Sequence, residues 1–367
     1  MLKILFVFLL VVHGLIHGMG FVKAFDWFPI TTLHRNIGKL EGAFWLLTTL
    51  LFVAAGILYF IDLKSWIIIA GISILLSQFL IILNWNEARF GTIINVLVLV
   101  ILVLQYSAAR FKSGFIEDVK RELAAGSTEV VKKNSINDLQ HLPYPVQQYM
   151  IQSGFLEQEE IRNFRVEFKG RIRASATSEW MEFTTVQYSF IDHPARYFFM
   201  EAKMYGLPVA GYHAYSKGKA MMDIRLLSLL QVQFQDGELM DISETVTFFN
   251  DVCLMAQAAL VDGRIKWKST SNNEVDAEFT NGKSSISARL IFAEDFKLIN
   301  FITNDRYFLS DKELKKVQWE TPVRTYNKAK RFLQMERGDA VWKLQEGDFC
   351  YGEFTVMDIK YNVSSME

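Results

Sequence analysis

The chain has 367 residues, which is enough for two domains, and a formal net charge of −1 at pH 7. A balance so near neutrality gives no reason to expect nucleic acid or another polyanion as a partner. Two cysteines, Cys253 and Cys350, cannot make a framework of disulfide bonds, so the class of small disulfide-rich secreted domains is excluded.

The first 110 residues are far more apolar than the rest, because most charged residues follow Arg110. They contain four long apolar runs, at residues 2–22, 41–61, 66–83 and 91–109. Each is close to the ~20 residues with which a helix crosses a bilayer. The loops between the last three runs are short, so neighbouring helices must be antiparallel. The sequence therefore predicts a four-helix transmembrane domain over residues 1–110.

The first apolar run is longer than the core of a signal peptide, and no Ala-x-Ala site closes it, so we expect a retained helix. Four spans put both ends of the bundle on one side of the membrane. That side carries Lys3, Lys64, Arg110, Lys112, Lys120 and Arg121, and the other side carries Lys23, Arg35, Lys39 and Arg89. The positive-inside rule therefore predicts a multi-pass protein of the inner (plasma) membrane with its C-terminal domain in the cytoplasm.

Residues 111–142 are predicted to form a helical linker. The segment FKSGFIEDVKRELAAG continues the fourth helix with mostly polar residues, and Gly126 is a typical helix end. The run HLPYP then stops helix formation, and residues 146–153 predict a short helix. A β-rich soluble domain is predicted over residues 143–367.

From Asn163 onward the apolar period changes to two residues, which is typical of strands with one buried face. In the second strand, a change of phase at Thr184-Thr185 predicts a β-bulge. Asn281-Gly282 is a strong hairpin signal. Strands are predicted at residues 163–173, 180–190, 196–205, 209–216, 220–225, 230–235, 264–268, 274–280, 284–292, 297–303, 315–320, 325–333, 340–345 and 353–362.

One helix interrupts the strands, at residues 243–260, with Ser243 as its N-cap. A mainly antiparallel sheet of about a dozen strands cannot stay flat, so it must curl. Several strands carry aromatic residues in both phases, which gives the sheet two faces to cover with one helix. We therefore predict a curled sheet or half-barrel with the helix against its concave side and an apolar groove beside it. A closed barrel with the helix as a plug is the alternative.

His13 and His17 are four residues apart, so they project from one face of the first apolar helix. Ionisable groups inside a membrane are costly and often functional. Metal ligation, haem ligation and proton transfer, with Glu41, Asp26 or His34 as partners, are the functional interpretations. Gly14 and Gly18 repeat the same spacing, which favours hydrogen bonding between closely packed helices instead.

A second group of polar residues lies where the apolar runs end. By topology, Asn84, Glu87 and Arg89 share a membrane side with His34 and Glu41. They could form a small-ligand site, or Glu87 and Arg89 could make an interfacial ion pair of little energetic weight. The predicted membrane polar site comprises His13, His17, His34, Glu41, Asn84, Glu87 and Arg89.

The C-terminal half contains no G-x-S-x-G, P-loop, H-E-x-x-H or C-x-x-C motif. His193 and His213 have no nucleophile beside them in the sequence. The spacing therefore favours a non-enzymatic protein, and it predicts no cofactor and no metal in this half.

The segments HGLIHGMGFVKAF and NWNEARFGTIINVL resemble the membrane part of a bacterial family that is known only as a domain of unknown function. Later segments resemble the soluble part of that family: LPYPVQQYM, SEWMEFTTVQYSF, GYHAYSKGKAMM, ETVTFFNDVCLMAQAAL, NDRYF and VWKLQEGDFCYGEFTVMDIKYN. The resemblance implies no particular activity. The pattern of many strands and one helix is also similar to the curved half-barrels of lipoprotein carriers and related lipid-binding proteins, although the chain has no lipobox cysteine.

The first functional hypothesis is that the β domain binds an apolar ligand, either a lipid or a lipid-modified chain. Its basis is the excess of apolar strand faces over available cover, since exposed apolar surface usually marks binding. The predicted ligand-binding residues are Trp180, Phe199, Tyr212, Tyr215, Met222 and Phe249. Two alternatives remain: a membrane redox, metal or ion-handling protein that uses His13, His17, His34 and Glu41, and a structural scaffold with a filled β domain.

Overall fold

The computed structural model describes residues 2–30, 34–126, 132–269, 271, 273–310, 313–327, 329–330 and 332–366. The chain divides into two compact units, Met1–Arg110 and Phe111–Glu367. Residues 111–126 and 132–142, which lie within the segment predicted as a linker, belong to the second unit.

The first unit is helical. Its elements are α1 (Leu2–Ala24), α2 (Lys39–Phe60), α3 (Trp66–Leu83), the single turn α4 (Trp85–Ala88) and the first part of α5 (Gly91–Ala125). Helices α1, α2, α3 and α5 are each long and apolar enough to cross a membrane, so the predicted four apolar helices are confirmed. A Cβ on Gly14 would lie 2.8 Å from the Cβ of Phe52, so α1 approaches α2 this closely only with glycine there.

The second unit is built around one sheet of fourteen strands among the described residues. The strands are β1 (Asn163–Ile172), β2 (Met181–Phe190), β3 (Ala195–Met204), β4 (Leu207–Ser216), β5 (Lys219–Leu226), β6 (Leu230–Asp236), β7 (Ile265–Ser269), β8 (Glu274–Asn281), β9 (Ser284–Phe292), β10 (Leu298–Ser310), β11 (Glu313–Glu320), β12 (Val323–Tyr326), β13 (Met335–Leu344) and β14 (Gly347–Tyr361). The helices are α6 (Tyr144–Gln152) and α7 (Glu238–Met255), with single 3₁₀ turns at Ile136–Leu139, Phe155–Glu157 and Gln257–Val261.

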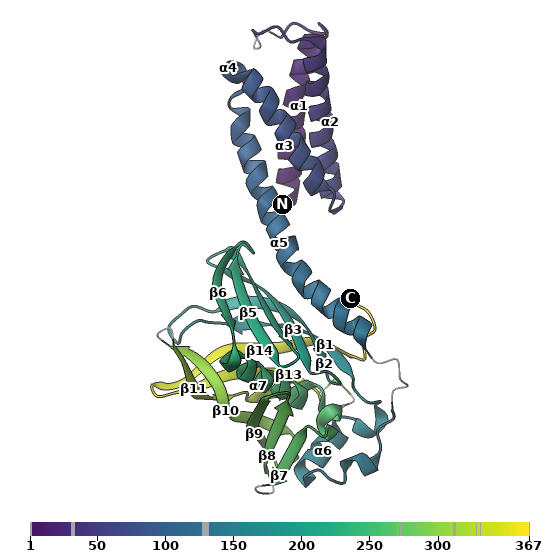
Figure 1. Ribbon diagram of the computed structural model, residues 1–367, viewed down its shortest axis with the longest axis vertical. Helices are drawn as coiled ribbons and strands as arrows, with labels where there is room; N and C mark the ends of the chain where they lie inside the picture. The colour runs from purple at the N-terminus through teal and green to yellow at the C-terminus, as the bar shows by residue number, and fades with distance from the viewer. Residues whose placement is uncertain are drawn as a thin grey trace. The chain divides into compact units, whose positions relative to one another are not determined.

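The strand order is β6-β5-β4-β3-β2-β1-β14-β13-β11-β10-β9-β8-β7, with β12 added beside β13. Every strand pairing in the described part of the chain is antiparallel. Strands β6 and β7 end the order and do not pair with each other, so the sheet is open rather than a closed barrel. It curls around α7, as Figure 1 shows, and the predicted half-barrel with a helix is confirmed.

Both faces of the sheet are covered between β2 and β5. On the inner face, Phe183 and Phe198 belong to the main core, which also contains α6 and α7. On the opposite face, Phe111, Phe115 and Val119 of α5 pack in a second cluster with Tyr188, Phe190, Tyr197, Phe199 and Tyr212. Residues 111–125 of α5 are therefore a covering helix of the sheet.

This covering helix explains why the predicted bulge at Thr184-Thr185 is wrong. Strand β2 pairs with β1 and β3 without a shift of register. The apparent phase change arises because Val186, Tyr188 and Phe190 are apolar on the face beneath α5. The irregularity lies instead between Glu167 and Phe168, where β1 pairs with β14.

Two predicted boundaries are also wrong. The long helix begins at Glu238 after Gly237, whose φ of 90° no other residue adopts easily, so Ser243 lies inside the helix and is not its N-cap. The strand predicted over residues 325–333 ends at Tyr326.

Candidate functional site

A cavity of about 490 Å³ lies in the second unit between α7 and the inner face of the sheet. This volume is within the range of small-molecule sites in proteins. Much of the wall is apolar: Phe168, Ile172, Phe198, Met200, Met222, Ile224, Met240, Leu254, Met255, Phe308, Trp319, Met335, Trp342 and Phe354. Five of these are methionines, whose unbranched side chains adapt to ligands of different shape.

Helix α7 divides its residues between the cavity and the core. Met240, Glu244, Thr247 and Asp251 follow the helical spacing of three and four residues, and all line the cavity. The other face packs into the core, where the ring of Phe249 stacks on Phe279 at a centroid distance of 5.2 Å. The helix is thus buried on both sides, and its cavity side carries two carboxylates, Glu244 and Asp251.

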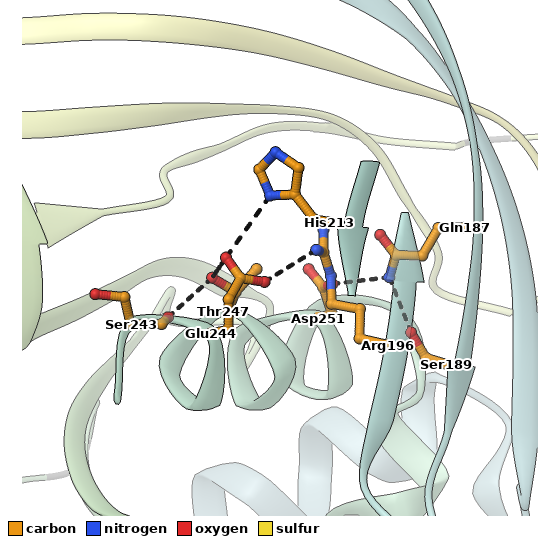
Figure 2. Close-up of polar contacts among 8 residues, drawn as sticks. All are labelled: Gln187, Ser189, Arg196, His213, Ser243, Glu244, Thr247 and Asp251. Carbon is orange, nitrogen blue, oxygen red and sulfur yellow. Dashed lines mark hydrogen bonds and ion pairs between the residues drawn. The ribbon is translucent and has the colours of Figure 1, made fainter. Parts of the chain in front are cut away.

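The polar face of α7 is neutralised by a buried arginine from β3 (Figure 2). Arg196 Nε donates to Asp251 Oδ2 at 2.7 Å, and its Nη1 donates to Glu244 Oε2 at 3.2 Å. Gln187 Nε2 also donates to Asp251 Oδ2, at 2.8 Å, and to Ser189 Oγ, at 2.9 Å. A buried charge is tolerated when it is paired and hydrogen-bonded, which is the case for these three.

The two carboxylates of this cluster respond differently to their surroundings. Burial alone would raise the pKa of Glu244, but His213 and Arg196 outweigh burial and lower its pKa to about 2. For Asp251, burial is the stronger effect and the pKa is raised despite Arg196. His213 Nδ1 lies 3.9 Å from Glu244 Oε1, a distance that allows an ion pair with a protonated ring but is too long for a hydrogen bond.

Two polar atoms on the cavity wall have no hydrogen-bond partner in the described structure. One is Gln187 Oε1 and the other is Nη1 of Arg306. The Arg306 guanidinium lies 4.0 Å from the ring centroid of Trp319 and 5.7 Å from that of Trp342, so two cation–π contacts hold it in place. Buried polar atoms usually have hydrogen-bond partners, so these two atoms mark a place where the wall can form further hydrogen bonds, with a bound ligand.

The structure distributes the six predicted ligand-binding residues over four environments. Met222 lines the cavity. Tyr215 and Phe249 are fully buried in the core beside it, with the Tyr215 hydroxyl 2.9 Å from Thr245 Oγ1. Phe199 and Tyr212 lie on the opposite face of the sheet, under α5.

Trp180 is the sixth of these residues and lies outside the cavity lining. The guanidinium groups of Arg171 and Arg173 both lie over its ring, at 4.6 and 4.5 Å from the ring centroid. Aromatic residues pack equally well between a sheet and a covering helix and in the wall of a cavity. Residue type alone therefore does not show which aromatic residues line the cavity.

Sequence reasoning missed the charged cluster of Arg196, Glu244 and Asp251. A signal was present, since Glu244 and Asp251 are seven residues apart and therefore on one face of the helix. Arg196 is preceded by Ala195 and followed by aromatic residues in β3, where nothing indicates a buried partner 48 or 55 residues away.

In the first unit, His13 and His17 join a hydrogen-bonded network that links α1, α3 and α5. His17 Nδ1 faces the carbonyl of His13 at 2.9 Å, and a carbonyl only accepts, so this nitrogen carries the hydrogen. In the neutral ring, Nε2 then accepts from the Ser77 hydroxyl at 2.8 Å. His13 Nε2 is 3.0 Å from Asn95 Oδ1, and Asn95 Nδ2 donates to Ser77 Oγ at 2.9 Å.

Four of the remaining residues of the predicted membrane polar site form a second cluster with Arg35: His34, Glu41, Asn84 and Glu87. Glu41 Oε1 accepts from Asn84 Nδ2 at 2.8 Å, and its Oε2 lies 3.4 Å from Arg35 Nη2. Glu87 Oε1 accepts from the backbone N–H of His34 at 2.7 Å and from that of Arg35 at 3.2 Å.

Arg89 lies apart from this cluster. Its guanidinium is 5.2 Å from the ring centroid of Phe90, and no ion pair between Arg89 and Glu87 is present among the described residues. No group of three His, Cys, Asp or Glu residues in the described chain is placed to hold a metal ion.

We expect that replacing His13 and His17 together with leucine leaves the four helices able to insert and lowers the thermal stability of the bundle modestly. Hydrogen bonds between membrane helices contribute about 0.6 kcal/mol each on average, and the substitution removes two. Thermal unfolding of the full chain in detergent measures the effect. Thr48→Val is the control, because the Thr48 hydroxyl bonds only within its own helix. If the stability were unchanged and metal analysis showed that the variant had lost an ion bound by the unmodified chain, the two histidines would instead form a ligand site.

Several solved structures are similar to the second unit, among them the following three. The second unit is similar to a DUF1329 family protein from Desulfovibrio piger, with a TM-score of 0.35, 10% identity, and coverage of 60% of this chain and 93% of that chain. It is similar to a putative outer membrane lipoprotein-sorting protein domain from Vibrio parahaemolyticus, with a TM-score of 0.33, 9% identity, and coverage of 60% and 94%. A LolA superfamily protein from Nitrosomonas europaea gives a TM-score of 0.31, 10% identity, and coverage of 59% and 94%.

Among curated proteins, none matches the sequence. One family model matches residues 132–354, which is more than half of the chain and includes most of the cavity wall. The resemblance to a family of unknown function that the sequence segments indicate is thereby confirmed. The chain belongs to the family of unknown function DUF6544.

Proposed function

We propose that this is a multi-pass membrane protein whose β domain holds one amphipathic lipid, or the acyl chain of a lipid-modified molecule, without acting on it chemically. The observation that carries the proposal is the cavity of about 490 Å³ between α7 and the sheet. It lies inside a unit that follows four helices long and apolar enough to cross a membrane.

The energetics favour an acyl chain as the apolar part of the ligand. Each buried methylene contributes about 0.8 kcal/mol. Ten methylenes therefore contribute about 8 kcal/mol, from which the entropic costs of association are subtracted. The methionines and aromatic residues of the wall provide apolar contact without demanding one chain shape.

The polar part of the wall favours a ligand that is not purely hydrocarbon. Arg306 Nη1 is an unpaired donor held between two tryptophans, and Gln187 Oε1 is an unpaired acceptor. A carbonyl or anionic oxygen of a lipid head group would satisfy the donor, and a hydroxyl or amide would satisfy the acceptor. Arg196 is already neutralised by Glu244 and Asp251, so it is not expected to bind the head group.

The test uses the full chain in liposomes that contain a phospholipid with a photoactivatable acyl chain. After illumination, mass spectrometry of peptides locates the cross-links. We expect labelled peptides from β5, α7 and β10, and we expect Met222→Trp to weaken that labelling because the larger side chain takes up part of the cavity. Labelling of α1–α3 should be unchanged, which provides an internal control.

Met221→Trp is the matched control variant. Met221 precedes Met222 on β5 and packs on the opposite face of the sheet, against the cluster beneath α5. It should retain the labelling of the cavity. An absence of cavity cross-links in the unmodified chain, or equal labelling in Met222→Trp, would contradict the proposal.

A further inference from the structure

The hairpin turns of β2–β6 differ in chemistry between the two ends of the sheet. Because successive strands are antiparallel, the β3–β4 and β5–β6 turns lie at one end, and the β2–β3 and β4–β5 turns lie at the other. At the second end the turns are largely polar, with Asp192-His193 and Lys217-Gly218. At the first end they are Tyr205-Gly206 and Leu227-Ser228-Leu229.

The side chains of the first end are exposed although they are large and apolar. Tyr205 is 91% exposed, Leu207 47% and Leu230 56%. On β6, Val232 and Phe234 continue the exposed series on the face away from the cavity, whereas Gln233 and Gln235 line the cavity. We name Tyr205, Leu207, Leu229, Leu230, Val232 and Phe234 the apolar rim.

The turns of the apolar rim use residues that fit their backbone poorly. Tyr205 has a φ of 50° and Leu227 a φ of 55°, in the left-handed region that glycine and asparagine adopt most readily. The β4–β5 turn has the same length and φ signs, yet it has Lys217 (φ 53°) in the place that Tyr205 takes. Large side chains in a backbone conformation that costs them free energy indicate that the apolar rim has a function.

The chain enters the second unit beside the apolar rim. The ring of Phe111 lies 5.7 Å from that of Phe199 on β3 and 4.6 Å from the guanidinium of Arg225 on β5. Lys112 Nζ lies 3.3 Å from Glu201, four residues before Tyr205, and Arg225 is two residues before Leu227. The backbone N–H of Leu227 donates to the carbonyl of Pro208 at 2.7 Å, which ties the two turns together.

Phe111 follows the last residue of an apolar helical run by only two positions. A helix rises about 1.5 Å per residue, so the entry point of the second unit is within a few Å of the edge of that run. Phe111 contacts β3 and β5, the strands that lead into the turns of the apolar rim, so a bilayer crossed by this run is an apolar surface within reach of the rim. Tyrosine and leucine are residues that suit the membrane interface.

We propose that the apolar rim docks on the lipid bilayer in which the helices of the same chain are anchored. The cavity lining includes Ile224 and Gln233, which are paired with each other three to four residues from the β5–β6 turn. Docking therefore brings the cavity wall close to membrane lipid. The proposal does not require the cavity to hold a ligand, so it can stand or fail independently of the proposed function.

The experiment compares two single cysteines on the full chain, each labelled with the environment-sensitive fluorophore NBD. The variants are Tyr205→Cys at the apolar rim and Lys217→Cys at the other end of the sheet, which are matched in turn length and in φ. Both carry Cys350→Ser, and the remaining Cys253 is fully buried. The protein is placed in phosphatidylcholine liposomes with and without a spin-labelled phospholipid, a contact quencher.

The expected result is that the probe at position 205 shifts to shorter wavelength and loses most of its fluorescence to the spin-labelled lipid, whereas the probe at 217 does neither. Adding Leu207→Glu and Leu230→Glu to the rim should restore the fluorescence. Equal behaviour at the two positions would overturn the proposal. The proposal would also be overturned if the spin-labelled lipid did not quench the probe at 205 and its fluorescence changed instead with protein concentration, which would indicate contact with a second copy of the chain through edge strand β6.

Discussion

Replacing Arg196 with methionine is expected to destabilise the β domain by about 3–5 kcal/mol, because it leaves buried carboxylates without their charge partner. Glu244 and Asp251 both rely on Arg196, at 3.2 and 2.7 Å. Methionine has a similar volume, so the loss comes from charge and hydrogen bonding rather than from an empty space. Chemical unfolding of the full chain in detergent, followed by tryptophan fluorescence, measures the change.

The acid-dependent loss of stability that Glu244 contributes should weaken in the same variant. In the unmodified chain the pKa of Glu244 is about 2, below its ordinary value near 4.5, so its contribution to stability is present above pH 4.5 and is lost as the pH falls toward 2. Without Arg196, burial at Glu244 is opposed by His213 and Arg306 alone, so the pKa of this carboxyl in the folded state rises toward its ordinary value. The folded variant then loses less stability as the pH falls from 4.5 toward 2 than the unmodified chain does.

Two further variants separate this explanation from general damage. The triple variant Arg196→Met, Glu244→Gln and Asp251→Asn should recover most of the lost stability, because no buried charge remains unpaired. Arg324→Met removes an exposed partner of Asp339 and should cost no more than about 1 kcal/mol. A triple variant as unstable as the single one would show that Arg196 acts through packing instead.

The second large effect is expected from Phe115→Ala on α5. Phe115 is almost fully buried and contacts the rings of Tyr188, Phe199 and Tyr212 on the sheet face opposite the cavity. Removing a buried phenylalanine ring costs about 3–5 kcal/mol. The Tyr212 hydroxyl donates to Asp118 and the Tyr197 hydroxyl donates to Glu122 at 2.9 Å, so these bonds should open when α5 loosens.

Hydrogen exchange of residues 111–125 distinguishes a loosened helix from global unfolding. We expect faster exchange in α5 and in the β3–β4 hairpin, with little change in β8 and β9, which contact other parts of the core. Lys120→Ala is the control, since Lys120 is exposed on the same helix and alanine is an excellent helix former. Exchange that rises equally throughout the second unit would mean that α5 does not act as a separate cover.

Much of the fold could be predicted because it depends on local patterns. The apolar runs predict α1, α2, α3 and the start of α5 to within a few residues, since a bilayer requires a fixed length of apolar helix. Alternation predicts most strands, because side chains in a strand point to opposite faces. The bulge at Thr184-Thr185 was wrong because alternation assumes one covered face, and α5 covers the second.

The candidate site could be predicted only in part. A groove beside one helix follows from the number of strands, but which aromatic residues line it depends on which face of the sheet each neighbour covers. Met222 lines the cavity and Tyr212 does not, although both are apolar residues of adjacent strands. Arg196, Glu244 and Asp251 meet across about fifty residues of chain, a distance over which sequence periodicity carries no information.

The sequence by itself therefore determined the four apolar helices, the antiparallel strands and the single long helix among them, because each depends on hydrophobic periodicity within a short segment. Only the tertiary structure decided that residues 111–125 cover the sheet, that an arginine of β3 neutralises the polar face of α7, and that a cavity of about 490 Å³ remains beside them. The physical reason is that burial and charge pairing are properties of neighbours in space, and curling a sheet around a helix brings together residues that are far apart in the chain.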